Sequence, residues 1–321
     1  MRTLLLLLIV CLAGASFDAR AGEYPERPIK LIVPYPPGGG TDIAARFVAK
    51  KLGERLHRQL IVDNRSGANG NLGTHLIAQA EPDGYTVGMA TPGPVTVGRS
   101  LYPSLPYDPQ NDLVPIIIVN ESPIVLVVNP AVPARNTQEL VALAKSEPGK
   151  LTAALVSVGS VPHLVTEMFK AAAGIDVLDV PYKGGGPAAI DVMSGRVDMF
   201  FSVVPLVLPY IKSGKLRAIA VASANRSALL PDVPTLQESG YSVVGSAWNG
   251  LVAPRGTPKA IVAKLNAETR GILASDATKQ AFEALGMEAV GGSPEEFRAF
   301  LAAERNKWAR VIADRHIKAE Q

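Results

Sequence analysis

The chain has 321 residues, with 32 Lys and Arg against 29 Asp and Glu, which gives a formal net charge of +3 at neutral pH. It has no basic run and no basic patch interleaved with aromatic residues, which argues against nucleic acid as a partner. A charged content of 19% beside 47% hydrophobic residues is typical of a compact, well-packed protein.

The N-terminus has the pattern of a cleavable export signal. Arg2 supplies positive charge, residues 4–12 form an apolar run too short to span a membrane, and Ala19-Arg20-Ala21 fits an A-x-A cleavage motif. We therefore expect residues 1–21 to be a signal peptide and the mature chain to begin at Gly22. No later segment is a transmembrane candidate, so we expect a soluble protein that is either periplasmic or secreted.

The single cysteine excludes several kinds of site. Cys11 lies inside the apolar run of the signal, and Val10 stands before it where a lipoprotein signal carries a small residue. We therefore expect no lipid on Cys11. The mature chain is then expected to contain no disulfide and no metal bound by cysteine.

The first element of the mature chain is the most informative one. Residues 29–33 are apolar and predict a buried strand, residues 34–37 contain three prolines that cannot continue a sheet, and three glycines follow at 38–40. Thr41 is a good N-cap for a helix whose apolar residues recur at helical spacing as far as residue 56. This arrangement presents bare backbone N–H groups at a helix N-terminus, which suits an anion such as a carboxylate.

Two other interpretations of this loop remain. A glycine-rich turn between a strand and a helix is often only a tight connection with no ligand. A phosphate nucleotide is a poor candidate, because no lysine precedes Thr41 as in a P-loop and the pattern G-x-G-x-x-G is absent.

Strands and helices alternate along the rest of the chain. This order predicts an α/β fold with mixed, mostly parallel sheets that are flanked by helices. Three helices are expected to close the chain, with room for a short strand between the last two. The expected strands are residues 60–63, 85–90, 113–119, 124–128, 151–157, 177–180, 197–202 and 216–222, and the expected helices are residues 71–80, 137–146, 161–173, 187–194, 258–274, 276–285 and 294–314.

The strands and helices divide into two similar halves, although no break in composition separates them. The C-terminal helices need a sheet to pack on, and a first domain made of two segments would provide one. We therefore expect domain 1 to comprise residues 22–120 and 248–321, and domain 2 to comprise residues 121–247. The candidate crossovers are residues 120–123 and 242–250.

No catalytic constellation can be assembled from the sequence. The four histidines lack metal-ligand spacing, and no G-x-S-x-G motif surrounds the serines near His163. His163 is better explained as a local hydrogen-bonding or capping residue than as a catalytic base. The alternative function is a secreted α/β hydrolase-like enzyme acting on a small acid, with Ser160 and His163 as its reactive pair. Because no Asp or Glu is placed to orient His163, we expect no enzyme activity, no cofactor and no metal.

Several segments together resemble one protein family. They include YPERPIKLIVPYPPGGGTDIAARFVAKKL at residues 24–52, VDNRSGANGNLG at 62–73, DVPYKGGGPAAIDVMSGRVDMFF at 179–201 and GKLRAIAVASANRSALLPDVPTLQESG at 214–240. In this order and spacing, the chain resembles the Bug-type (TctC-like) periplasmic solute-binding receptors of tripartite tricarboxylate transporters. The resemblance covers essentially the whole mature chain.

The resemblance implies a two-domain clamshell of the type II-like periplasmic-binding-protein kind. Such a receptor captures a small organic carboxylate in the cleft between its domains and delivers it to membrane transporter subunits, and we expect it to act as a monomer. In relatives the proline–glycine loop holds a carboxylate partly through ordered water, and a loop of the facing domain completes the site. The residues thereby assigned to ligand binding are Tyr35, Pro36, Pro37, Gly38, Gly39, Gly40, Thr41 and Asp42 in one loop, and Ser157, Gly159, Ser160 and His163 in the other.

Two departures from the family pattern bear on the ligand. The second loop reads ALVSVGSVPHL at residues 154–164, which is more apolar than in relatives, and Ser202 stands where many relatives carry an acidic residue. Both favour a carboxylate with an aromatic or otherwise apolar body over an amino acid or a hydroxylated polycarboxylate. Thr91, at the end of a strand, and Trp248, near the second crossover, complete the expected contacts, although a packed core position is an equal alternative for Trp248.

The glycine loop yields one further expectation. A valine at Gly39 should block the close approach of the backbone to the ligand. It should also force a glycine-only backbone conformation into strain.

Overall fold

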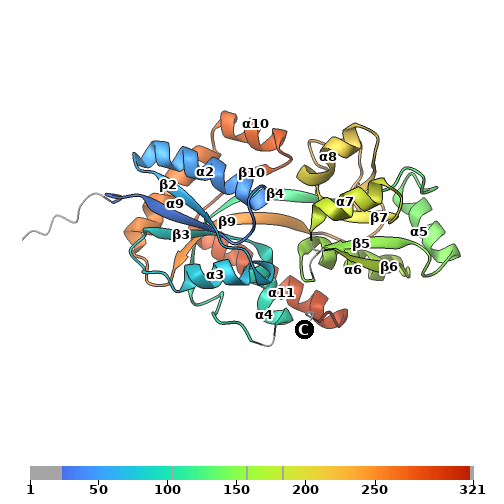
Figure 1. Cartoon of the computed structure of the whole chain (residues 1–321), viewed down its shortest axis with the longest axis horizontal. Coiled ribbons are helices and arrows are strands. Elements are labelled where there is room, and N and C mark those ends of the chain that lie inside the picture. Colours follow the sequence, from blue (N-terminus) through green and yellow to red (C-terminus); the bar gives the residue numbers. More distant parts are fainter. Residues whose placement is uncertain (1–23, 103, 157, 183, 319–321) are drawn as a thin grey trace, which may run out of the picture.

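The structure is a computed structural model that describes residues 24–102, 104–156, 158–182 and 184–318. Two lobes lie side by side and are joined by long central strands (Figure 1). The predicted export signal falls outside the described residues. In the part of the chain that is described, no helix is both long and apolar enough to cross a membrane.

The first lobe is built around parallel strands. β1 (Ile29–Val33) lies between β2 (Leu60–Asn64) and β3 (Thr86–Ala90). The helical elements of this lobe are α2 (Gly40–Leu56), η1 (Ala68–Gly70), α3 (Asn71–Ala78), η2 (Gly93–Val97), α4 (Gly98–Leu101), α9 (Lys259–Leu273), α10 (Asp276–Ala284) and α11 (Pro294–Asp314). α2 buries Ala44, Val48 and Leu52, which recur every four residues, and it contacts β1 and α9.

The second lobe repeats the same plan. β5 (Thr152–Val156) lies between β6 (Leu178–Tyr182) and β7 (Met199–Val203), and both pairings are parallel. The remaining elements are β8 (Arg217–Val221), α5 (Thr137–Ser146), α6 (Val161–Ala173), α7 (Gly185–Met193) and α8 (Val204–Lys212). Asn136 caps α5 and Ser160 caps α6, each through its side-chain oxygen.

Two strands run from one lobe to the other. β4 (Leu113–Val128) pairs antiparallel with β9 (Ser246–Pro254) over its first part, and with β7 and β8 over its last residues. β9 also pairs with β3, and β10 (Glu288–Gly291) pairs with β4. The described strands therefore form one continuous mixed sheet along the path β2-β1-β3-β9-β4-β7-β5-β6.

The centre of this sheet differs from the sequence prediction. The segments 113–119 and 124–128 form one strand, which passes an irregularity beside Pro115 and changes partners after Pro123. Pairing is parallel on the flanks but antiparallel along β4 and β9. The prediction also lacks β9 and α8, whereas the α/β class and the helices at 137–146, 161–173 and 294–314 are confirmed.

The lobes share a hydrophobic core. One cluster joins second-lobe residues such as Phe169 and Phe201 to Val97, Leu101 and Trp308, which come from η2, α4 and α11. α11 accordingly packs against η2 and α4 and also against α6. The C-terminal helix therefore contacts both sides of the cleft described below.

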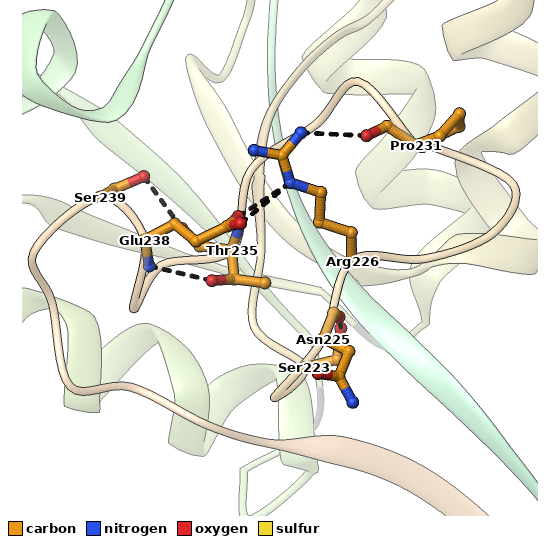
Figure 2. Close-up of polar contacts among 7 residues, drawn as sticks. All are labelled: Ser223, Asn225, Arg226, Pro231, Thr235, Glu238 and Ser239. Carbon is orange, nitrogen blue, oxygen red and sulfur yellow. Dashed lines mark hydrogen bonds and ion pairs between the residues drawn. The ribbon is translucent and has the colours of Figure 1, made fainter.

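A network of polar contacts orders the connection from β8 to β9 (Figure 2). Arg226 Nε donates to both carboxylate oxygens of Glu238, at 3.1 and 2.9 Å. Glu238 in turn accepts from the backbone N–H of Thr235 at 2.7 Å, and its own N–H donates to Thr235 Oγ1 at 2.9 Å. This network holds the chain just before it enters β9, the strand that carries Trp248.

Candidate functional site

A cleft with a volume of about 780 Å³ lies between the two lobes. Its walls come from the loop after β1, from η1 and η2, and from the first turns of α6, α7 and α8. The paired strands β4 and β9 add residues where they pass from one lobe to the other. The predicted contacts that line it are Tyr35, Pro36, Pro37, Gly38, Gly39, Gly40, Thr41, Thr91, Ser160 and Trp248. Four predicted contacts, Asp42, Gly159, His163 and Ser202, are not part of the lining, and Ser157 lies outside the described residues.

Asp42 supports the loop after β1 (the first loop, residues 34–39) through side-chain hydrogen bonds. Its Oδ2 accepts from the backbone N–H of Gly38 and from Arg46 Nε, each at 2.9 Å, and its Oδ1 accepts from Asn64 Nδ2 at 2.9 Å. Burial acts to raise the pKa of Asp42, but the hydrogen bonds from Arg46, Gly38 and Asn64 outweigh it and lower the pKa below its ordinary value. Asp42 is thus an ionised, buried support of the loop.

The start of α2 differs from the prediction. The N-cap is Gly39 and no side chain caps it, so the cap role predicted for Thr41 is wrong. Gly39 has φ −80° and ψ 167°, which any residue adopts, so the strain predicted for a valine there is also wrong. The left-handed residue is Gly38, with φ +85°. An uncapped helix start leaves backbone N–H groups free to meet an anion.

The loop before α6 (the second loop, residues 158–160) is held by His163. The backbone N–H of Gly159 donates to His163 Nδ1 at 2.9 Å, so the proton of the neutral ring lies on Nε2. Burial lowers the pKa of His163, against the opposing charges of Glu167 and Asp179. His163 is therefore a neutral internal acceptor.

Ser160 is also engaged by the backbone. Its Oγ donates to Val156 O at 2.5 Å and accepts from the backbone N–H of His163 at 3.3 Å. Among the described residues, no hydrogen bond joins the Ser160 hydroxyl to the His163 ring. The two side chains therefore serve as a helix cap and a loop support, and a nucleophile–base pair is not assembled.

Ser202 and Trp248 differ in their position, because only Trp248 lines the cleft. Ser202 is 1% exposed on β7, and its Oγ donates to Val203 O at 3.4 Å. Trp248 lines the cleft, packs edge-to-face on Phe297 and Phe300, and donates from Nε1 to Glu304 Oε2 at 3.3 Å. Trp248 is thus both a core residue and a cleft wall.

A cluster of hydrogen-bonded polar side chains lines part of the cleft. Tyr35 Oη donates to Asn69 O at 3.3 Å and accepts from Thr91 Oγ1 at 3.4 Å. Asn69 Nδ2 reaches across to the second lobe, where it donates to Val158 O at 3.5 Å. Burial raises the pKa of Tyr35, so its hydroxyl stays protonated. Asn69 therefore lies where the lobes meet.

The described lining contains no Asp, Glu, Lys, Arg or His side chain. Bare helix starts replace them, with Gly39 as the N-cap of α2 in the first lobe and Gly184 as the N-cap of α7 in the second. The first turns of α6, α7 and α8 each contain one proline without a backbone N–H, namely Pro162, Pro187 and Pro205. Among the helices that begin at the cleft, α2 therefore keeps the fullest set of first-turn N–H groups.

Several lining residues were not assigned by the sequence prediction. Asn69, with φ +51°, is a turn residue that only the packing of the lobes brings to the cleft. The glycine run at 184–186 was a visible signal, because it separates a strand from a helix as the first loop does. The other unassigned lining residues are Pro92, Gly93, Ser122, Val156, Val161, Pro162, Pro187, Val203, Pro205, Leu206, Ala247 and Asn249.

Within the described residues, no group of three or more His, Cys, Asp or Glu side chains could hold a metal ion. The features available for recognition are therefore backbone donors, hydroxyl and amide groups and an apolar surface. Such a set binds and orients a solute.

Comparison with known proteins supports this view of the cleft. The family described as "Tripartite tricarboxylate transporter family receptor" matches residues 44–317. The chain belongs to this receptor family. It is 41% identical to protein BugT of Bordetella pertussis over 309 residues, which cover 96% of this chain and 95% of BugT.

Two solved structures similar to this receptor hold small carboxylates. R. palustris Rpa4515 with adipate has a TM-score of 0.86 and 34% identity, and the match covers 93% of this chain and 100% of that one. MatC from Rhodopseudomonas palustris with bound malate has a TM-score of 0.80 and 30% identity, with 90% and 100% covered. This receptor therefore has relatives of the same fold that bind dicarboxylic acids.

Proposed function

We propose that this receptor captures a small organic carboxylate in its cleft and delivers it to membrane subunits of a tripartite tricarboxylate transporter. One observation carries the proposal: uncapped glycine helix starts from opposite lobes, at α2 and α7, line a single cleft whose described walls carry no charged side chain. Backbone N–H groups and helix dipoles would then supply the favourable charge for the anion.

The body of the acid is proposed to be aromatic or otherwise apolar. The supporting surface consists of Pro36, Val161, Val203, Leu206 and Trp248, all of which line the cleft. An amino group would find no described acidic side chain in the lining, and many hydroxyl groups would remain unpaired against this surface. Adipate has such an apolar body, whereas malate carries a hydroxyl group on a shorter chain.

The wider context of the receptor is also proposed. Its family is one of periplasmic receptors, so we propose export through the signal at residues 1–21 and a mature, monomeric protein beginning at Gly22. We retain domain 1 as residues 22–120 with 248–321 and domain 2 as residues 121–247. The packing of α9 on α2, and of α11 on η2 and α4, supports joining the C-terminal segment to the first domain.

A carboxylate panel tests the proposed function. The mature protein is melted with adipate, benzoate, malate and aspartate, and adipate or benzoate is expected to raise the melting temperature most. A ligand at 100 times its Kd adds about 2.7 kcal/mol to the free energy of unfolding. Proton NMR of the acids after incubation should show them unchanged. Stabilisation by none of the acids would contradict the receptor proposal, and consumption of an acid would favour the enzyme.

A further inference from the structure

The indole N–H groups of both tryptophans donate hydrogen bonds to the same carboxylate, that of Glu304. Glu304 Oε2 accepts from Trp308 Nε1 at 2.8 Å and from Trp248 Nε1 at 3.3 Å. All three side chains are buried, with 7% exposure for Glu304, 1% for Trp248 and none for Trp308. A buried carboxylate shared by two indoles joins two distant parts of the chain.

The two indoles lie in different parts of the structure. Trp248 is on β9 and forms a wall of the cleft, whereas Trp308 is on α11 and belongs to the hydrophobic core that the two lobes share. Gly245, the residue before β9, lies close to Trp308, Val161 and Val165. Because Val161 also lines the cleft at the start of α6, Trp308 lies behind one wall while Trp248 forms another.

The carboxylate that joins them is fully partnered. Its second oxygen, Oε1, pairs with Lys307, whose Nζ lies 4.2 Å from the centre of the Trp308 ring. Glu304, Lys307 and Trp308 lie on one face of α11 because they are three and four residues apart. Loss of the carboxylate would leave two buried indole N–H groups without their acceptor, so the orientation of both rings depends on it.

We propose that Glu304 is a positioning residue that fixes the Trp248 indole as a cleft wall and couples it, through α11 and Trp308, to the second lobe. The coupling of cleft occupancy to this link rests on the proposed function, but the link itself does not. A solute pressed against Trp248 would then act on both lobes through one buried carboxylate.

The link can be tested without any solute. With two tryptophans, the ¹H–¹⁵N spectrum contains two indole Nε1–H resonances, and a carboxylate acceptor moves such protons downfield. Glu304→Gln is expected to move both resonances upfield. Trp308→Phe should move the Trp248 resonance downfield, since one of two competing donors is gone, and it should have a smaller effect in the Glu304→Gln background, where the acceptor is a neutral amide oxygen.

The controls separate this role from general destabilisation. Glu295→Gln makes the same chemical change at an exposed position of the same helix and should move neither resonance. Glu304→Asp keeps the charge with a shorter reach, so the Trp248 resonance should move upfield more than that of Trp308, and this variant decides the question if Glu304→Gln fails to fold. Unmoved indole resonances, or an equal effect of Trp308→Phe in both backgrounds, would overturn the proposal.

A second arm adds adipate and benzoate, with binding followed by calorimetry. In wild type, a binding acid should move both indole resonances. In Glu304→Gln it should move only that of Trp248, with affinity weakened about fivefold. Binding that leaves Trp308 unmoved in wild type would overturn the coupling. If neither acid binds, the proposed function fails for these acids, while the solute-free spectra still decide the role of Glu304.

Discussion

The first and second loops share one backbone arrangement but use different side chains to support it. In each, a left-handed glycine follows a strand and donates its N–H to the side chain four residues later, in the next helix. Gly38, with φ +85°, donates to Asp42, and Gly159, with φ +79°, donates to His163, both at 2.9 Å. One support is an ionised carboxylate and the other is a neutral imidazole.

The helix starts that these supports position are also unlike each other. The first loop leads into an uncapped helix that begins with Gly40 and Thr41, whereas the second leads into Ser160, Val161 and Pro162, with the cap already made by the serine. We infer that the first loop is organised to meet an anion and the second to hold an apolar wall. The same backbone device thus serves two purposes.

The largest expected effect comes from removing the ionised support. Asp42→Ala deletes the acceptor of three hydrogen bonds from a buried position and should lower the free energy of unfolding by about 3 kcal/mol. Urea denaturation measures the change. Glu54→Ala is the control, since it removes an exposed carboxylate of the same helix that is paired only with Lys51 in the contacts described, and it should cost about 0.5 kcal/mol or less. Equal losses in the free energy of unfolding would contradict the role of Asp42 as a buried support of the first loop.

The two left-handed glycines should differ in their tolerance of alanine. A Cβ at Gly38 meets no atom within 4 Å, so Gly38→Ala should cost only its backbone strain, about 1 kcal/mol. At Gly159 a Cβ would lie 2.3 Å from Leu101 Cδ2, a buried atom on α4, so Gly159→Ala should cost about 2 kcal/mol. Thermal and urea unfolding rank the two variants, and the reverse order would contradict the packing of α4 on the second loop.

Solute binding should separate the two helix starts. Gly39→Val places a branched side chain in the cleft without backbone strain and should weaken the best acid of the panel at least about tenfold, or 1.4 kcal/mol. Ser160→Ala should leave affinity within about twofold, yet it should lower stability by about 1 kcal/mol through loss of the cap. Calorimetric titration and urea unfolding of both variants measure these effects. Unchanged affinity in a folded Gly39→Val protein would exclude the first loop from the site.

The smallest expected effect is on the way the free energy of unfolding depends on pH. Burial lowers the pKa of His163 from its ordinary value of 6.5, so the unfolded chain binds a proton more readily than the folded one. The stability that this provides is present above pH 6.5 and is lost as the pH falls below it. Asp42, whose pKa is lowered from 3.8, keeps its contribution until much lower pH. Urea unfolding at pH 7.5 and 5.5 should show a fall in wild type that His163→Gln reduces, and an equal fall in both would refute it.

Local signals in the sequence predicted much of the fold and of the site. Three glycines after a proline-rich strand end predicted the first loop, and the helix predicted at residues 137–146 is α5. The prediction of β4 was incomplete: it ended one strand at residue 119 and began another at 124, whereas β4 accommodates Pro115 beside a register shift and continues through Pro123, where it changes partners. Nothing in the sequence indicates those compensations.

Contacts across the two lobes were the part that sequence reasoning missed. Asn69 reaches the cleft and Glu304 reaches Trp248 only after segments far apart in the chain have packed together. The family resemblance assigned Asp42 and His163 to the ligand, although the residues alone had favoured a local hydrogen-bonding or capping role for His163. Their side chains instead point back to Gly38 and Gly159, an orientation that depends on backbone angles that residue type alone does not specify.

The pairing of β3 with β9 also constrains the order in which the chain can fold. Met89 lies opposite Leu251, so the open edge of β3 has no partner until β9 has been synthesised. An exposed strand edge pairs readily with other chains, and contacts between residues so distant in sequence form slowly. A chain emerging from the ribosome therefore carries an unpaired strand edge from the synthesis of β3 until that of β9, and a chaperone that shields residues 86–90 would protect it from aggregation.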